Sequence, residues 1–381
     1  MKVGVPKETR AGERRVALVP DLVQRYAKLG GEVIVEHDAG KASFFLDVHY
    51  REAGATIAAG PAELYADADF VLKVQRPQDE EIGSIKSGTA LVALLQPLSN
   101  IDLIKQLADG GVTSFSMDAI PRIARAQKMD ALTSQSSVAG YKAALVAADA
   151  LGKHLPLMMT AAGTMPPAKG LVLGAGVAGL QAIATARRLG AVLEAFDVRP
   201  AVKEQVESLG ATFIEDEVVS DEAEDAGGYA TELSEDHQRR EQEMIHRHVR
   251  DADFVITTAL IPGRLAPLLV TEEMVADMKP GSVIIDLAAE TGGNCAMTTP
   301  GESVLVGDGV LIHGPLNLPS EMPIHASQMY ARNIFSFFEH LVQDGELKLD
   351  FEDAITKDAC ITHEGKIVQE ATLAAADAAA G

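Results

Sequence analysis

Short apolar runs recur along the chain, and patterns typical of helices lie between them. The first series covers residues 2–6, 32–36, 69–74, 89–95 and 112–118. A second series, which begins near Lys169, consists of LVLGAG, VLEAFD, DFVITTA, SVIIDLA and VLIHG. Most of these runs are continuously apolar, as buried parallel strands are, and their spacing is that of successive βα units. The pattern therefore predicts the α/β class, with two Rossmann-like, doubly wound parallel sheets.

The two series of strands predict two domains. The first comprises residues 1–135 and about 325–381, where a long helical pattern returns the chain to it; the second comprises residues 136–324. A hinge helix is predicted at 136–151. We expect the alanine-rich tail, residues 371–381, to be frayed. Two doubly wound domains in one chain imply a cleft between them, where ligands of such proteins usually bind.

Acidic residues dominate the charge of the chain. Asp and Glu number 55 against 33 Lys and Arg, which gives a formal net charge of −22. Such a field repels nucleic acid and anionic lipid, so we expect neither as the main partner. Cys295 and Cys360 lie far apart without CxxC spacing, which suggests neither a disulfide framework nor a metal site and indicates a reducing compartment. We expect no signal peptide and no membrane span, because no apolar run is long enough.

Part of the acidic charge is concentrated in residues 215–236, EDEVVSDEAEDAGGYATELSED, which contain no Lys or Arg. A solvated surface insertion is one interpretation of this run. However, Gly227, Gly228 and Tyr229 place an aromatic side chain beside flexible glycines, a character common in lids over ligand sites. Both interpretations remain open on these residues alone.

A glycine-rich turn follows the first strand of the second series. Gly174, Gly176 and Gly179 have G-x-G-x-x-G spacing, with the strand before them and a helix ending at Gly190 after them. The first glycine permits a tight turn, the second lets a pyrophosphate approach the helix N-terminus, and the third allows close packing of helix and strand. With this context complete, the motif predicts a dinucleotide site.

Asp197 ends the next strand, about twenty residues after the motif, as a dinucleotide fingerprint requires. Its carboxylate would accept hydrogen bonds from ribose hydroxyls and repel a 2′-phosphate, which favours NAD over NADP. Arg199 has two interpretations: it could hold a phosphate, or it could be a surface cation paired with the acidic run.

Residues 121–137, PRIARAQKMDALTSQSS, bring several charged and amide side chains together. Taken alone, the stretch is best explained as a capped helix start with surface charges.

Four stretches together give the chain a resemblance to a known family: residues 5–20, VPKETRAGERRVALVP; residues 159–191, around the glycine motif; residues 257–263, TTALIPG; and residues 278–295, MKPGSVIIDLAAETGGNC. The chain resembles the NAD(H)-binding component, the soluble alpha subunit, of proton-translocating NAD(P) transhydrogenase. Alanine dehydrogenase is a related family. The resemblance extends from the first residues to about Val368.

The resemblance implies roles for individual residues. Arg122, Gln127 and Asp130 would hold the nicotinamide end of NAD(H), since a Gln amide has both the donor and the acceptor that a carboxamide needs. Thr133 would lie near the nicotinamide, although helix capping is its other possible role, and Leu260 would lie near the adenine or belong to the core. The remaining implied cofactor contacts are Ile123, Ala124, Ala175, Gly176, Val177, Val198 and Arg199, with Gly228 and Tyr229 on a mobile loop over the nucleotide.

The two related families require different chemistry. An alanine dehydrogenase needs a general acid/base beside its substrate carbonyl, and in that family a His on the strand after a KV-x-x-P motif serves. Here the motif is KVQRP and the following strand, TALVALLQPLSN, has Leu94 at the matching place; Glu290 replaces the aspartate of the D-x-G-G motif. Hydride exchange between two nicotinamides needs no acid/base. Arg15 and Lys73 match positions that bind the substrate carboxylate in alanine dehydrogenase, and structural ion pairing is the alternative for them.

The resemblance therefore implies a homodimeric catalytic component, cytoplasmic and peripheral on the inner face of the membrane. It would bind NAD(H) and exchange a hydride with NADP(H) on a partner subunit, coupled to proton translocation by a membrane-embedded subunit. A self-contained alanine dehydrogenase-type enzyme is the first alternative. A non-catalytic NAD-sensing module is the second.

Overall fold

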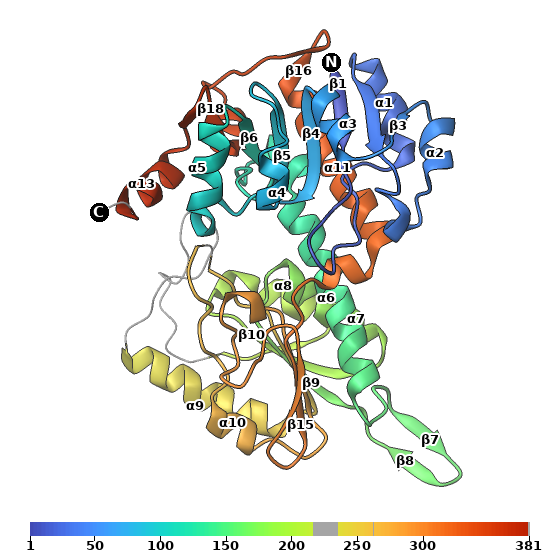
Figure 1. The fold of residues 1–381 in the computed structure, drawn as a ribbon. Helices are drawn as coiled ribbons and strands as arrows, with labels where there is room; N and C mark the ends of the chain where they lie inside the picture. The colour runs from blue at the N-terminus through green and yellow to red at the C-terminus, as the bar shows by residue number, and fades with distance from the viewer. Residues whose placement is uncertain (216–234, 262, 380–381) are drawn as a thin grey trace. The chain divides into compact units, whose positions relative to one another are not determined.

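The computed structural model describes residues 1–215, 235–261 and 263–379. The chain forms two compact units (Figure 1): the first unit is Met1–Gln135 with Ser320–Gly381, and the second unit is Ser136–Pro319. Among the described residues, no helix is both long enough and apolar enough to cross a bilayer.

The first unit is built on a sheet with strand order β3-β2-β1-β4-β5-β6-β18-β19. Neighbouring strands from β3 to β6 are parallel, and β18 runs antiparallel to both β6 and β19. The order reverses between β1 and β4, which is the switch point of a doubly wound fold. The strands are β1 (Lys2–Val5), β2 (Glu32–Glu36), β3 (Thr56–Ala58), β4 (Phe70–Gln75), β5 (Ala90–Leu94), β6 (Thr113–Ser116), β18 (Cys360–His363) and β19 (Lys366–Ile367), with a separate pair β16 (Val342–Gln343) and β17 (Glu346–Leu347).

Helices cover both faces of this sheet, because successive strand side chains point to opposite sides. Val3 and Phe70 pack in one cluster with Phe338 of α11, whereas Ile34 and Val71 pack in another with residues of α3 and α5. The helices are η1 (Pro20–Leu22), α1 (Val23–Lys28), η2 (Lys41–Ser43), α2 (Asp47–Glu52), α3 (Pro61–Asp67), α4 (Asp79–Ile82), η3 (Pro97–Ser99), α5 (Ile101–Asp109), η4 (Ala124–Met129), η7 (Leu318–Glu321), α11 (Pro323–Leu341), α12 (Ala354–Ala359) and α13 (Glu370–Ala378).

The second unit has strand order β11-β10-β9-β12-β13-β15-β14. Its strand pairs are parallel except β14 with β15, and the order reverses between β9 and β12. The strands are β9 (Lys169–Leu173), β10 (Val192–Phe196), β11 (Thr212–Phe213), β12 (Phe254–Thr257), β13 (Val283–Asp286), β14 (Ser303–Val306) and β15 (Val310–His313). These two sheets confirm the predicted α/β class with two doubly wound units.

Helices also lie on both faces of the second sheet. Residues of α6 and α7 form one apolar cluster with the strands, and residues of α9 and α10 form another. The helices are α6 (Ala131–Ala150), α7 (Val177–Arg188), η5 (Pro200–Val202), α8 (Lys203–Ser208), α9 (Glu235–Asp251), α10 (Glu272–Ala276) and η6 (Ala289–Thr291).

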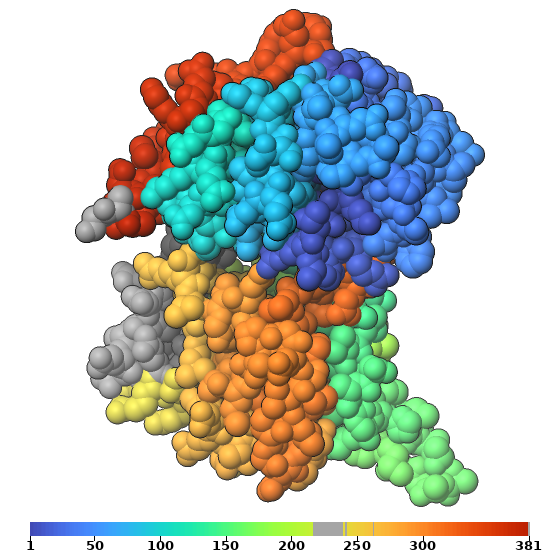
Figure 2. Space-filling view, in the orientation of Figure 1, coloured from blue at the N-terminus to red at the C-terminus, as the bar shows by residue number. Residues whose placement is uncertain are grey.

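A hairpin of β7 (Met158–Thr160) and β8 (Gly163–Met165) projects from the body of the second unit (Figures 1 and 2). Its residues are exposed along both strands, and Met159 is 77% exposed. The sequence pattern did not predict it, because its strands bury no alternating face.

Two sequence expectations were wrong. The tail expected to be frayed forms α13, whose first turn is capped by Gln369 and which packs against α5 and η3. Alanine is the best helix former, so low complexity there indicates a helix and not disorder. The helix expected at 136–151 begins earlier, at Ala131, because Asp130 caps it.

Candidate functional site

The carboxyl ends of β9, β10 and β12 meet at one edge of the second sheet, beside its switch point. The glycine motif follows β9, Asp197 to Arg199 follow β10, and Leu260 lies in the segment after β12. The structure therefore brings together the second-unit residues predicted to hold the nucleotide, apart from Gly228 and Tyr229, which lie outside the described residues.

The structure gives a different physical reason for glycine at each of the three motif positions. Gly174 has φ +97°, and a Cβ there would lie 2.7 Å from Thr258 Oγ1. A Cβ on Gly179 would lie 1.9 Å from the carbonyl oxygen of Gly174, so this glycine lets α7 pack against the turn. A Cβ on Gly176, in contrast, would meet no atom nearer than Arg199 Nη2, at 4.0 Å. Packing thus explains Gly174 and Gly179, whereas Gly176 leaves open space at the N-terminus of α7, where anions are stabilised.

The Asp197 carboxylate accepts hydrogen bonds from Arg199 and from the backbone of Ala175. Arg199 donates from its backbone N–H and Nε to Oδ1 at 2.9 and 2.8 Å, and from Nη2 to Oδ2 at 2.9 Å. The backbone N–H of Ala175 also donates to Oδ2, at 2.7 Å. A carboxylate has about four acceptor positions, so a ribose hydroxyl could bind here only by displacing one of these donors. Arg199 thus contacts Asp197 directly, a pairing that neither sequence interpretation included.

The side-chain amide of Asn294 helps to fix the segment after β12 to the rest of the edge. Asn294, which is fully buried, accepts from Ala259 N–H at 3.0 Å and donates to the carbonyl oxygens of Ala259 and Pro267 at 2.9 and 2.8 Å. Leu260, between these anchors, is 47% exposed, so it does not belong to the core.

Asp286, at the end of β13, supports the same edge and is also fully buried. It accepts from the hydroxyls of Thr257 and Thr298 and from the N–H groups of Ala288 and Cys295. The sequence reasoning missed both Asn294 and Asp286 as supporting residues. The available signals were an acid at the end of an apolar strand and an Asn after two glycines.

The predicted nicotinamide-binding residues lie together in the first unit: directly before η4, on η4 and at the start of α6. Arg122, Ile123, Ala124 and Gln127 are exposed. Asp130 caps α6: its Oδ1 accepts from Thr133 N–H at 2.8 Å and its Oδ2 from Thr133 Oγ1 at 2.5 Å. Asp130 is thus the capping residue, and Thr133 takes part in the cap as its donor. The segment η4 lies directly before this fixed helix start, with Ala126 and Met129 buried and Gln127 exposed.

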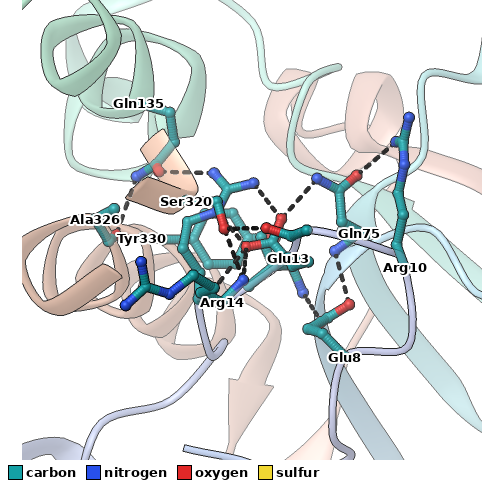
Figure 3. Close-up of polar contacts among 12 residues, drawn as sticks. Glu8, Arg10, Glu13, Arg14, Gln75, Gln135, Ser320, Ala326 and Tyr330 are labelled. Carbon is teal, nitrogen blue, oxygen red and sulfur yellow. Dashed lines mark hydrogen bonds and ion pairs between the residues drawn. The ribbon is translucent and has the colours of Figure 1, made fainter. Parts of the chain in front are cut away.

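Glu13, Gln75 and Gln135 belong to one polar network of the first unit (Figure 3). Arg15, which is buried, takes part in this network. Its guanidinium donates to Glu13 at 2.8 and 2.6 Å and to Gln135 Oε1 at 2.8 Å. Burial by itself raises the pKa of Glu13, but the hydrogen bonds and charge of Arg15, with a bond from Gln75, outweigh it and lower that pKa to about 2.

Lys73 is fully buried and lies 2.8 Å from Glu81 and 3.4 Å from Glu8. Burial opposes its charge, yet the two carboxylates outweigh this and raise the pKa of Lys73. Both Arg15 and Lys73 therefore take part in structural ion pairs. Leu94, where an alanine dehydrogenase would carry its His, is the half-buried last residue of β5.

Comparisons with known proteins place the chain in a family. Residues 4–139 match the family described as "Alanine dehydrogenase/PNT, N-terminal domain", and residues 143–370 match "Alanine dehydrogenase/PNT, C-terminal domain". The first part of NAD(P) transhydrogenase subunit alpha from Rhodospirillum rubrum is 48% identical over 379 residues, which cover 97% of this chain and 98% of that protein. Alanine dehydrogenase from Halomonas elongata is 31% identical over 381 residues, covering 98% of this chain and 96% of that protein.

Two solved structures are also similar. The transhydrogenase from Sinorhizobium meliloti has a TM-score of 0.85 and 43% identity, covering 97% of this chain and 100% of that one. An L-alanine dehydrogenase has a TM-score of 0.81 and 26% identity, covering 98% and 99% of the two chains. The chain therefore belongs to the alanine dehydrogenase/PNT family, and it shares more of its sequence with these NAD(P) transhydrogenases than with these alanine dehydrogenases.

Proposed function

We propose that the chain binds NAD(H) and exchanges a hydride directly with NADP(H) held by a partner subunit. The observation that carries this proposal is Gly176. Its open space at the N-terminus of α7 is not required by the packing of the protein itself, and it fits the approach of a pyrophosphate to unpaired backbone N–H groups. The adenosine end of the nucleotide would then lie along residues 197–199 and Leu260.

The exposed segment from Arg122 to Thr133 would hold the nicotinamide end. The Gln127 amide can both donate to and accept from the carboxamide, and Arg122 can reach ribose or phosphate oxygens. Asp130 would contribute mainly by fixing the start of α6, since its two oxygens already accept from Thr133.

Hydride exchange between two nicotinamides balances in atoms and electrons without the transfer of a proton. The C4 carbon of one dihydronicotinamide gives up a hydride, with its electron pair, and the C4 carbon of the other nicotinamide accepts it. The protein must therefore bring two rings together and keep water out, and positioning of this kind can account for a large part of a barrier. Leu94, an apolar residue at the end of β5, is compatible with this chemistry because no acid/base is needed.

The coupling of hydride exchange to proton translocation would take place in other subunits. The Rhodospirillum rubrum protein is named as one numbered part of a subunit alpha, which implies that further parts exist in that system. For this chain we propose an NADP(H)-binding subunit and a membrane-embedded subunit as partners, on which it would dock from the cytoplasmic side.

We also propose that the chain forms a homodimer. The β7–β8 hairpin supports this, because Leu157, Met159 and Met165 are 53%, 77% and 47% exposed. A projecting pair of short strands with apolar side chains is marginally stable in water unless another surface covers it.

Steady-state assays test the proposed function. Purified protein is first given NADH with pyruvate and ammonia, then NADPH with an oxidised NAD analogue, in the presence and absence of the NADP(H)-binding subunit. We expect activity only in the second assay with the partner present. Activity with pyruvate and ammonia would establish the alanine dehydrogenase alternative instead, and NADH binding without activity in either assay would favour the NAD-sensing module.

A further inference from the structure

The exposed segment η4 is held near each end by side chains from the C-terminal part of the first unit. Between these points, Ala126 and Met129 are buried in the core of the unit and η4 packs against α11. The opposite side of the segment presents Gln127 to solvent. A 3₁₀ helix has poorer hydrogen-bond geometry than an α-helix, so the position of such a segment depends on its tertiary contacts.

The first anchor is Asp353. Its Oδ2 accepts from Arg125 Nη1 at 2.5 Å, and its Oδ1 accepts from Ile355 N–H at 2.8 Å, which caps α12. The Asp353 side chain is 17% exposed, whereas that of Arg125 is 56% exposed. The ion pair thus joins a fixed helix cap to an exposed side chain of η4. The hydrogen bond from Arg125 lowers the pKa of Asp353, so the pair stays charged at neutral pH.

The second anchor is Asn333 of α11. Its Nδ2 donates to the backbone carbonyl of Lys128 at 2.9 Å, and its Oδ1 accepts from Ser134 Oγ at 2.7 Å. Asn333 is 9% exposed, so both bonds form away from bulk water. This one amide therefore fixes the end of η4 relative to the start of α6, on either side of Asp130.

We propose that Asp353 and Asn333 are positioning residues for hydride transfer: they hold η4 so that Gln127 and Arg122 present the nicotinamide in one orientation. This inference rests on the proposed function. Each residue would act through η4, because Asp353 bonds to Arg125 and Asn333 bonds to the carbonyl of Lys128. Because hydride transfer needs two rings near contact distance, a displacement of about 1 Å can lower the rate by as much as about 100-fold.

Conservative variants separate positioning from folding. Asp353→Asn removes the charge but keeps an N-cap acceptor, because Asn caps a helix as well as Asp does. Arg125→Gln removes the other partner of the pair. Lys357→Gln is the matched control, since it breaks an exposed ion pair of the same helix, to Glu370 at 2.9 Å, that does not contact η4.

For the second anchor, Asn333→Ala removes both bonds. Ser134→Ala removes the Ser134 hydroxyl, and with it the bond from that hydroxyl to Asn333, but leaves the bond from Asn333 to Lys128. This variant therefore separates the two halves of the second anchor.

The assay is NADPH-driven reduction of an NAD analogue by the full chain with its NADP(H)-binding subunit. We expect kcat to fall about tenfold in Asp353→Asn and Asn333→Ala while KM for the NAD analogue changes less than about twofold, because most of the proposed nucleotide contacts lie on the second unit. The double variant Arg125→Gln, Asp353→Asn should be no slower than either single one. Lys357→Gln should keep kcat within about twofold of the wild type. Ser134→Ala, which retains the bond to Lys128, should lower kcat less than Asn333→Ala does.

Hydrogen exchange gives a second readout that does not depend on activity. Amides in residues 122–130 should exchange faster in Asp353→Asn and Asn333→Ala, while amides of the strands of the first sheet keep wild-type rates. An active wild type with unchanged kcat in both variants would overturn the positioning role alone. A wild type inactive in the reconstituted assay would overturn the proposed function, and this inference with it. Faster exchange throughout the first unit would show a general folding defect and would also overturn the positioning role.

Discussion

Alanine substitutions of Gly179 and Gly176, two glycines of the same motif, separate the effect of packing on stability from the effect of the turn on nucleotide binding. In Gly179→Ala the new methyl group would lie 1.9 Å from the Gly174 carbonyl oxygen and 2.9 Å from its carbon. Both are backbone atoms and cannot rotate away, so α7 must shift by on the order of 1 Å to restore ordinary van der Waals contact. Overpacking of this kind costs about 1–3 kcal/mol, and we expect the upper end here. The melting temperature of the second unit should then fall by roughly 6–12 °C.

Gly176→Ala should behave in the opposite way. Its Cβ would meet nothing within 4 Å other than the end of the Arg199 side chain, and its φ of −73° suits any residue. Alanine lowers the entropy of the unfolded chain, which is worth about 0.4–1 kcal/mol, but it is a poorer N-cap than glycine. The two effects nearly cancel, so stability should stay within about 1 kcal/mol of the wild type. Affinity for NADH should nevertheless fall about 10- to 100-fold, because charge-assisted bonds worth about 1.5–3 kcal/mol are disturbed.

The measurement is a pair of numbers for each variant: the melting temperature without ligand, by circular dichroism, and the dissociation constant of NADH, by fluorescence titration at fixed pH and salt. Wild-type NADH affinity in Gly176→Ala would show that no phosphate binds at this turn, and would remove the main support for the proposed site. A wild-type melting temperature in Gly179→Ala would refute the packing argument.

Three further outcomes can be checked. As the pH falls from 4.5 towards 2, the free energy of unfolding should decrease, because Glu13 takes up a proton when the chain unfolds. In urea unfolding, Glu13→Gln should remove about 3 kcal/mol of that pH dependence. An unchanged pH dependence between 4.5 and 2 in this variant would contradict the low pKa of Glu13. Met159→Asp with Met165→Asp should convert a dimer to a monomer in sedimentation while the circular dichroism spectrum stays that of the folded chain; a dimer that persists in this variant would show that another surface forms it. Asn294→Ala should cost about 1–3 kcal/mol of stability and weaken NADH binding, since it leaves part-buried backbone groups of the segment after β12 without these bonds; wild-type values in both assays would exclude a supporting role.

The sequence by itself determined the fold class and the place of the nucleotide motif. Runs such as DFVITTA and SVIIDLA are apolar throughout, and strands buried on both faces need that pattern wherever they lie in the chain. The motif around Gly174 could be recognised because its requirements are local: a strand, a turn with positive φ, and a helix start follow one another directly. Short elements such as β3 and the β7–β8 hairpin were missed because they have too few residues to show a period.

Only the tertiary structure decided what each side chain of the site contacts. It showed that Gly176 alone among the motif glycines leaves open space, and that Arg199 donates hydrogen bonds to the Asp197 carboxylate. It also showed that Asn294 and Asp353 anchor segments far from them in the sequence. These contacts depend on distances between residues far apart in the sequence, and the local sequence around each residue does not determine those distances. A carboxylate or an amide can satisfy its bonding capacity with many partners, and folding selects among them by bringing particular backbone groups within reach.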